Sequence, residues 1–325
     1  MKNKNIIELS DAVKTYKNGV TALDHVSFTV EPGEFIFVVG ESGAGKSTLI
    51  KLLTREEKIN SGKVALDGYD LTQLPRRLVP FLRRKIGMIF QDFRLIEGKT
   101  VFENVAFAME IIGTKPEMIK RRVPLVLSQV GLRTKMNMYT DELSGGEAQR
   151  LGIARAIVNN PSLILADEPT GNLDPVNGEA IMALLECINQ EGTTVIACTH
   201  DKNLVDRMSK RVLEFSNGKL IRDACHATYS NKSACSDALV SRQAEIEAET
   251  AENYDYFGQA TGISEENEHI RIPKAIDVEK FILDSHKRRA NRREERRTEQ
   301  KRQIIEQGEV RQESHSNEHY EDFSG

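Results

Sequence analysis

The sequence has no run that approaches the roughly 18 to 20 consecutive apolar residues of a membrane-spanning helix. Its first residues, MKNKNIIELSDAV, lack the long apolar stretch of a secretory signal, so we expect a protein of the cytoplasm. Cysteine is scarce: the four cysteines show neither C-x-x-C spacing nor a companion histidine pattern. That spacing argues against a zinc site and against a disulfide framework.

Charge of either sign is also not in large excess. The 325 residues carry a formal net charge of -4, which gives no general argument for nucleic-acid binding, and we expect none. Residues 1–223 hold 30 Lys and Arg against 28 Asp and Glu, whereas residues 224–325 hold 15 against 21. Hydrophobic periodicity stops at the same place, so we expect a folded domain over 1–223 and a charged, low-complexity extension over 224–325.

Glycine is concentrated in VVGESGAGKSTLIKLL, residues 38–53, which passes from an apolar strand to an apolar helix. Glycine costs folding entropy, and close approach of the backbone to a ligand is the usual reason for a cluster of it. The spacing fits a phosphate-binding loop, with Lys46 reaching the phosphates and the Ser47 hydroxyl reaching Mg²⁺. A glycine turn without a ligand is the alternative, which the strand-before, helix-after context disfavours. The predicted nucleotide contacts are Gly40, Glu41, Ser42, Gly43, Ala44, Gly45, Lys46, Ser47 and Thr48.

A second apolar strand, in SLILADEP, ends in two carboxylates, Asp167 and Glu168. Open parallel sheets bind ligands at the carboxyl ends of their strands, which is where these side chains emerge. Asp167 would hold Mg²⁺, and Glu168 could act as the general base that polarises an attacking water. Alone, this segment is better explained as a strand followed by an acidic helix cap. Beside a phosphate loop, the catalytic interpretation is favoured.

The segment ELSGGEAQRLGIARAI, residues 142–157, places a serine and two glycines at the start of a predicted helix, where backbone N–H groups form an anion site. It resembles the signature of the ATP-binding cassette (ABC) ATPases. In that family the signature contacts the ATP held by a second subunit, so the resemblance implies a head-to-tail homodimer with two ATP molecules between the chains. The positions that match the signature are Leu143, Ser144, Gly145, Gly146 and Glu147.

Further positions match the ABC pattern in order and spacing. The resemblance assigns Gln91 to sensing the γ-phosphate and Mg²⁺, His200 to contacting the γ-phosphate, and Tyr16 to stacking on adenine. Each of these residues taken singly has an ordinary structural explanation, and their order around the two strong motifs favours the functional one. The resemblance also implies a loop that crosses the dimer interface, formed by Gly171, Asn172, Leu173 and Asp174.

The resemblance covers residues 1–223 and implies an α/β fold. The expected parts are a P-loop NTPase core with a mainly parallel sheet, an antiparallel β subdomain, and a helical subdomain that carries the signature, over roughly 72–160. The chain holds one phosphate loop and one signature. That argues against the tandem ABC factors, which carry two sets in one chain.

Within the family, the strings FQDFRL, TVFENV and GNLD are similar to the cell-division branch of ABC ATPases. This implies an ATP hydrolase that is peripheral at the cytoplasmic face of the cell membrane. It would couple ATP cycles to a small integral membrane protein of the FtsX type and so activate cell-wall hydrolases outside. Two alternatives stay open: the ATPase subunit of a lipoprotein-release or macrolide-efflux transporter, and a slow nucleotide-gated membrane scaffold.

The extension departs from the family pattern. Its first part is polar and acidic, as in disordered segments, and a basic helix is predicted near 276–307. Residues 287–302 contain nine Lys or Arg and three Glu. A solvated helix with internal ion pairs, contact with anionic lipid, and binding to nucleic acid or protein all fit this run.

Overall fold

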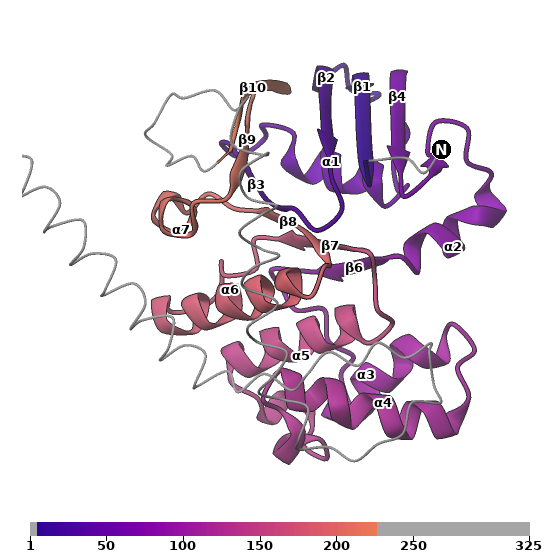
Figure 1. Ribbon diagram of the computed structural model, residues 1–325, viewed down its shortest axis with the longest axis vertical. Coiled ribbons are helices and arrows are strands. Elements are labelled where there is room, and N and C mark those ends of the chain that lie inside the picture. Colours follow the sequence, from indigo (N-terminus) through magenta and orange to yellow (C-terminus); the bar gives the residue numbers. More distant parts are fainter. Residues whose placement is uncertain (1–4, 226–325) are drawn as a thin grey trace, which may run out of the picture. The chain divides into compact units, whose positions relative to one another are not determined.

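The computed structural model describes residues 5–225 (Figure 1). Of the extension, only residues 224 and 225 are among them. The basic helix predicted near 276–307 lies outside the described residues. The described chain forms two sheets and a set of helices, and the α/β class predicted from the sequence is confirmed. Within the described residues, no helix has the length and apolar character needed to cross a bilayer.

The first sheet is antiparallel and has the strand order β2-β1-β4-β5. Its strands alternate buried and exposed side chains over much of their length, as expected for a sheet with one solvated face. This sheet is the predicted antiparallel β subdomain. Its strands are β1 (Ile7–Thr15), β2 (Thr21–Val30), β4 (Ser61–Leu66) and β5 (Tyr69–Asp70).

The second sheet has the order β10-β9-β3-β8-β7-β6, and all its pairs except β10 with β9 are parallel. Strands β3 and β8 are buried at every position, as for parallel strands covered on both faces. Strand β6 belongs to this sheet although it falls inside the stretch 72–160 expected for the helical subdomain, because that stretch leaves the core and returns to it. The strands are β3 (Phe35–Val39), β6 (Ile86–Ile89), β7 (Leu163–Asp167), β8 (Thr194–Cys198), β9 (Arg211–Ser216) and β10 (Lys219–Ala224).

Helices cover the two faces of the parallel sheet differently (Figure 1). One face packs on α1 and the antiparallel sheet, and the other packs on α3 to α6. Side chains that alternate along a strand therefore enter two separate cores. The helices are α1 (Lys46–Leu53), α2 (Val79–Arg83), α3 (Val101–Glu110), α4 (Pro116–Gln129), α5 (Gly145–Ile157), α6 (Pro175–Gln190) and α7 (Lys202–Met208).

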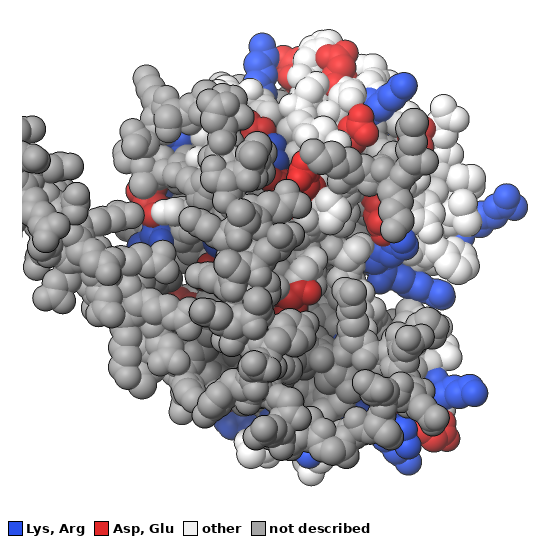
Figure 2. Space-filling view, in the orientation of Figure 1, with Lys and Arg blue, Asp and Glu red and all other residues white. Residues whose placement is uncertain are grey.

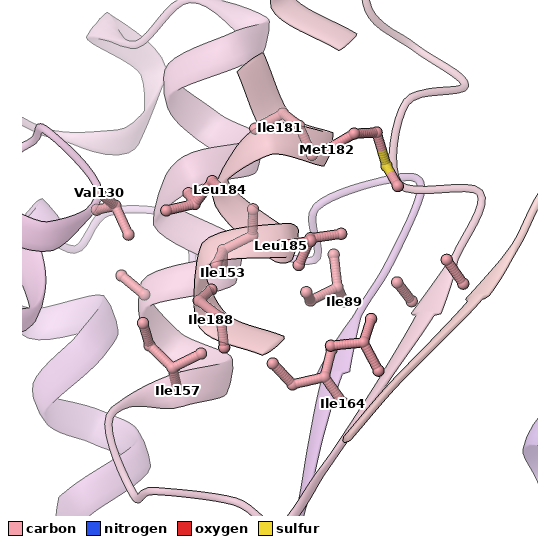
Figure 3. Close-up of a cluster of buried hydrophobic side chains, with 14 of the residues drawn as sticks. Ile89, Val130, Ile153, Ile157, Ile164, Ile181, Met182, Leu184, Leu185 and Ile188 are labelled. Atoms are coloured by element: carbon pink, nitrogen blue, oxygen red, sulfur yellow. The ribbon is translucent and has the colours of Figure 1, made fainter. Parts of the chain in front are cut away.

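The larger core joins the signature helix to the strands. Side chains of α6, Ile181 to Ile188, lie against Ile153 and Ile157 of α5 and against Ile89 and Ile164 of the sheet (Figure 3). All are nearly or fully buried. Because protein cores are closely packed, α5 is expected to move together with strands β6 and β7.

Two cysteines, Cys187 and Cys198, are buried free thiols, as expected for small apolar side chains. Cys225, at the end of the described residues, is disulfide-bonded, which the cysteine spacing did not predict.

Candidate functional site

The glycine-rich loop follows β3 and leads into α1, as the sequence predicted. Gly40 and Gly45 have φ values of 151° and 113°, which favour glycine. A Cβ atom at Gly40 would lie 2.3 Å from the Phe215 carbonyl oxygen, and one at Gly45 would lie 2.5 Å from that of Ala22. Both glycines are therefore needed to seat the loop, whereas a Cβ at Gly43 meets nothing within 4 Å. The open side of the loop leaves room for a ligand.

The Lys46 ammonium lies over this loop, donating to the carbonyl oxygens of Gly40 at 2.6 Å and Glu41 at 3.1 Å. Lys46 is the first residue of α1, so its positive charge adds to that of the helix N-terminus. A lysine and a helix N-terminus at one loop form a binding site for phosphate groups. Ser47 and Thr48 follow in the first turn of the same helix.

The carboxylates predicted to act together are adjacent at the end of β7. Burial, followed by the charge of Glu168, raises the pKa of Asp167 above its ordinary value, and Lys46 counteracts this. Glu168 has φ of 47°, an uncommon conformation for a residue with a side chain, and its N–H donates to the Cys198 carbonyl at 3.0 Å. The strained backbone sets the direction in which the Glu168 carboxylate points.

His200 lies beside that carboxylate. Its Nδ1 atom is 2.9 Å from Glu168 Oε2, and the imidazole side chain is 73% exposed while the Glu168 side chain is 16% exposed. The two residues follow β8 and β7, which are neighbours in the sheet. The sheet thus brings His200 beside the adjacent carboxylates Asp167 and Glu168, which lie more than 30 positions earlier in the sequence.

Gln91 follows β6, the edge strand beside β7. The Asn172 side chain donates to the Gln91 carbonyl at 2.9 Å, and the Gln91 amide donates to Asn172 Oδ1 at 3.4 Å. A Cβ atom at Gly171 would be 3.0 Å from Gln91 Nε2, so a glycine there gives the glutamine room. The predicted γ-phosphate glutamine and the predicted interface loop 171–174 are therefore in direct contact.

Tyr16 lies near the same helix as Lys46, because its hydroxyl is 3.2 Å from the Thr48 hydroxyl. The ammonium of Lys14 is 4.9 Å from the centre of the Tyr16 ring. A ring held in this way can present its other face to a planar base.

The signature segment forms the beginning of α5, with Ser144 as the N-cap residue. The N–H and hydroxyl of Ser144 donate to Glu147 Oε2 at 3.1 and 3.0 Å. The other oxygen of Glu147 is 2.7 Å from the ammonium of Lys135. This lysine is the largest cause of the lowered pKa of Glu147, which is about 2. Gly145 is exposed, whereas a Cβ atom at Gly146 would lie 2.5 Å from Asn177 Oδ1, so a glycine there lets α5 approach the start of α6. Leu143 packs against the core.

The loop 171–174 also starts a helix. Asp174 is the N-cap of α6 and accepts from the N–H groups of Val176 at 3.0 Å and Asn177 at 3.1 Å. The Val176 side chain is 78% exposed, and Leu173 packs against the core.

Two residues near the site were missed in the sequence, Gln149 and Lys135. Gln149 is 1% exposed, and its amide donates to the Pro169 carbonyl at 2.7 Å, directly after Glu168. Lys135 orients Glu147 from a separate turn, Arg133–Lys135. The position of Gln149 within the signature helix is a usable signal, but no sequence pattern links Lys135 to Glu147.

The oxygen donors available at the strand ends suit Mg²⁺. The hydroxyl of Ser47, the carboxylate of Asp167 and the amide oxygen of Gln91 are hard ligands, and phosphate oxygens complete such a set in nucleotide sites. Within residues 5–225 no group of three or more His, Cys, Asp or Glu residues could hold a metal by itself.

The chain is similar to known proteins in both sequence and structure. Residues 23–171 match the family model described as ABC transporter. The chain is 52% identical over 224 residues to the cell division ATP-binding protein FtsE of Streptococcus pneumoniae, covering 69% of this chain and 97% of that protein. It is 51% identical over 226 residues to FtsE of Bacillus subtilis, covering 70% and 99% of the two chains. A dimeric ATP-binding cassette solved in a post-hydrolysis state with ADP and Pi is similar with a TM-score of 0.62 and 35% identity, covering 69% of this chain and all of that one.

Proposed function

Because the chain belongs to the ABC transporter family, in its FtsE group of cell division ATP-binding proteins, we propose that it hydrolyses ATP to drive a membrane complex in cell division. The observation that carries this proposal is the meeting of the glycine-rich loop, Glu168 and His200 at one edge of the parallel sheet. The ATP hydrolase activity follows from the family and from this geometry together.

Different residues of the site have different roles in ATP hydrolysis. The loop amides and Lys46 bind the phosphates, and Tyr16 supports the adenine. Glu168 takes a proton from the attacking water, and His200 steadies its carboxylate from 2.9 Å away. Ser47, Asp167 and Gln91 would hold Mg²⁺, which neutralises charge on the β- and γ-phosphates.

A complete site uses two copies of the chain. Helix α1, which carries Lys46, packs on one face of the parallel sheet, and α5, which begins at Ser144, packs on the other. Ser144 and Gly145, at the start of α5, are exposed, so they are accessible to a nucleotide held by a second chain. The related cassette crystallised as a dimer with ADP and Pi supports a homodimer in the ATP state.

The membrane partner we propose is of the FtsX type, with activation of cell-wall hydrolases as the result of ATP cycles. Helix α3 begins shortly after Gln91 and leaves Phe107 38% exposed, and the adjoining Ile111 is 66% exposed. These side chains offer an apolar surface to a partner helix. The relatives at about 50% identity favour this partner over the lipoprotein-release and efflux alternatives and over a slow scaffold.

A pull-down tests the proposed partner. The Glu168→Gln protein, loaded with ATP, is used to capture proteins from detergent-solubilised native membranes, with Lys46→Ala as the control that does not load. We expect mass spectrometry to find a small permease with few spans and one extracytoplasmic domain. A large permease built around an efflux or lipoprotein path would contradict the cell-division assignment and leave the ATPase assignment intact.

We also propose that residues 287–302 attach the chain to anionic lipid at the cytoplasmic face of the membrane. Nine Lys or Arg against three Glu give this stretch the charge for such contact, worth about 1 kcal/mol per basic residue near the surface. The full-length chain should float with vesicles that contain anionic phosphatidylglycerol and not with neutral phosphatidylcholine vesicles. Chains in which Arg288, Arg289, Arg292 and Arg293 are replaced by Gln should lose flotation. Equal flotation of both forms would contradict the proposal.

A further inference from the structure

The segment just after Gln91 contains two consecutive residues in the left-handed region. Phe93 has φ of 59° and Arg94 has φ of 46°, and neither is glycine. This conformation is disfavoured for residues with a Cβ atom, and two in a row are rarer still. A strained turn persists only where the surrounding structure holds it in place, and such turns gather at functional sites.

The side chain that holds this turn comes from the signature helix. The guanidinium of Arg155, in α5, donates through Nη2 to the Phe93 carbonyl at 2.8 Å and through Nη1 to the Arg94 carbonyl. Its two N–H groups thus bind two successive backbone oxygens, which suits the rigid fork of arginine. Burial lowers the pKa of Arg155, and within residues 5–225 the side chain forms its hydrogen bonds with these two carbonyls and no salt bridge.

Contacts within the turn itself are more exposed. The Arg94 guanidinium lies 4.0 Å from the centre of the Phe90 ring, and its ion pair with Asp92 joins side chains that are 62% and 67% exposed. Exposed pairs of this kind stabilise little. Arg155 is therefore the main restraint on the turn from outside it.

The other end of the same loop is held by Asn172, which donates to the Gln91 carbonyl at 2.9 Å. Residues 91–94 thus lie between the loop 171–174 and helix α5. Helix α5 also reaches the loop after Glu168, through the bond from Gln149 to the Pro169 carbonyl at 2.7 Å. Helix α5 is thus bonded to the loop that carries Gln91, the predicted γ-phosphate sensor, and to the loop that follows Glu168, the predicted general base.

We propose that Arg155 is a positioning residue that holds the strained turn at Phe93 and Arg94 and thereby fixes Gln91 for ATP hydrolysis. The inference rests on the proposed role of Gln91. Because Ser144 begins the helix that carries Arg155, a shift of α5 upon contact with the partner chain's nucleotide is transmitted to Gln91 through this guanidinium. Arg155 touches no reacting atom in this scheme.

The test distinguishes two possible causes of lost ATP turnover, the backbone strain of the turn and the loss of the Arg94 side chain. ATP turnover is measured for Arg155→Lys, which keeps the charge and loses the fork, in three forms of the chain: wild type, Arg94→Gly and Arg94→Ala. Glycine relieves the left-handed strain, and alanine removes the same side chain while the strain remains. We expect Arg155→Lys to lower kcat about tenfold in the wild type and in Arg94→Ala, and less than about threefold in Arg94→Gly.

Three further measurements make the result specific. Affinity for a fluorescently labelled ATP should change less than about twofold in Arg155→Lys, since the glycine-rich loop is untouched. Arg121→Lys, an exposed arginine on α4, is the matched control and should keep wild-type turnover. Thermal unfolding midpoints report whether a variant is folded.

The same loss in all three forms, or no loss from Arg155→Lys, would overturn the inference. A fall of the unfolding midpoint that accounts equally for the losses in all three forms would also overturn it, because it would make the role merely structural. A wild-type chain without ATP turnover, or with turnover unaffected by Glu168→Gln, would instead overturn the proposed function, so the two failures are distinguishable.

Discussion

At the scale of single residues, the site depends on backbone conformations that ordinary residues avoid. Glu168 has φ of 47°. Gly40 has a positive φ, and a Cβ atom there would clash with the Phe215 carbonyl oxygen. Strain of about 1 to 3 kcal/mol per residue persists where it aims a functional group. At Glu168 the consequence is that the carboxylate lies beside His200 rather than along the continuation of β7.

Replacing Glu168 by Gln removes the proposed general base while keeping the shape of the side chain. We expect ATP turnover to fall about 10²-fold or more, with labelled-nucleotide affinity retained, because base catalysis supplies about 10² to 10⁴ of the rate. Single-turnover hydrolysis measures this directly. Turnover at the wild-type rate would mean that another group acts as the base.

Lys46 is tested at the level of binding. Lys46→Ala removes the ammonium that lies over the glycine-rich loop, and we expect the dissociation constant for labelled ATP to rise at least about tenfold, since charge-assisted bonds to phosphate are lost. Lys51→Ala, an exposed lysine in the last turn of α1, is the matched control and should bind as the wild type does. Equal affinities for both variants would contradict the role of Lys46.

At the scale of elements, the sequence predicts the strands and helices that have strong local patterns. The run before Gly40 and the run before Asp167 are apolar throughout, so their burial in a parallel sheet follows from the residues alone. The placement of β6 in the sheet could not be predicted, because its four residues are flanked by helical segments and only pairing with β7 defines it. Lys135 and Arg155 act through contacts distant in sequence, which a single chain does not reveal.

At the start of α5, Glu147 should make the stability of the folded chain depend on pH. The pKa of Glu147 is lowered to about 2 in the folded chain, chiefly by Lys135, whereas the unfolded value is about 4.5. A lowered pKa means that its stabilisation is present above pH 4.5 and is lost as the pH falls toward 2. Solvent screening reduces the contribution to about 1 to 2 kcal/mol.

Urea unfolding of wild type and Glu147→Gln measures this contribution as a function of pH. The difference in the free energy of unfolding should be largest at pH 7 and shrink below about pH 4.5. In a Lys135→Ala background the difference should be smaller at pH 7. A difference that grows as the pH falls would contradict the assigned cause of the shift.

At the scale of the whole molecule, the glycine-rich loop and the signature segment, which we propose as the two halves of the ATP site, lead into helices that pack on opposite faces of one sheet. Ser144 and Gly145, at the start of α5, are exposed, which suits contact with a second chain. On the face seen in Figure 2, Lys and Arg side chains lie among Asp and Glu where the described surface is visible.

The most direct test of the account is therefore the oligomeric state as a function of nucleotide. Sedimentation velocity of the Glu168→Gln chain should show a monomer with ADP and a dimer with ATP and Mg²⁺, because the γ-phosphate joins Ser144 of one chain to the glycine-rich loop of the other. Adding Ser144→Arg, which blocks the start of α5, should leave labelled ATP bound and abolish the dimer. A monomer with ATP, or a dimer that forms equally with ADP, would contradict the claim that two chains share each ATP.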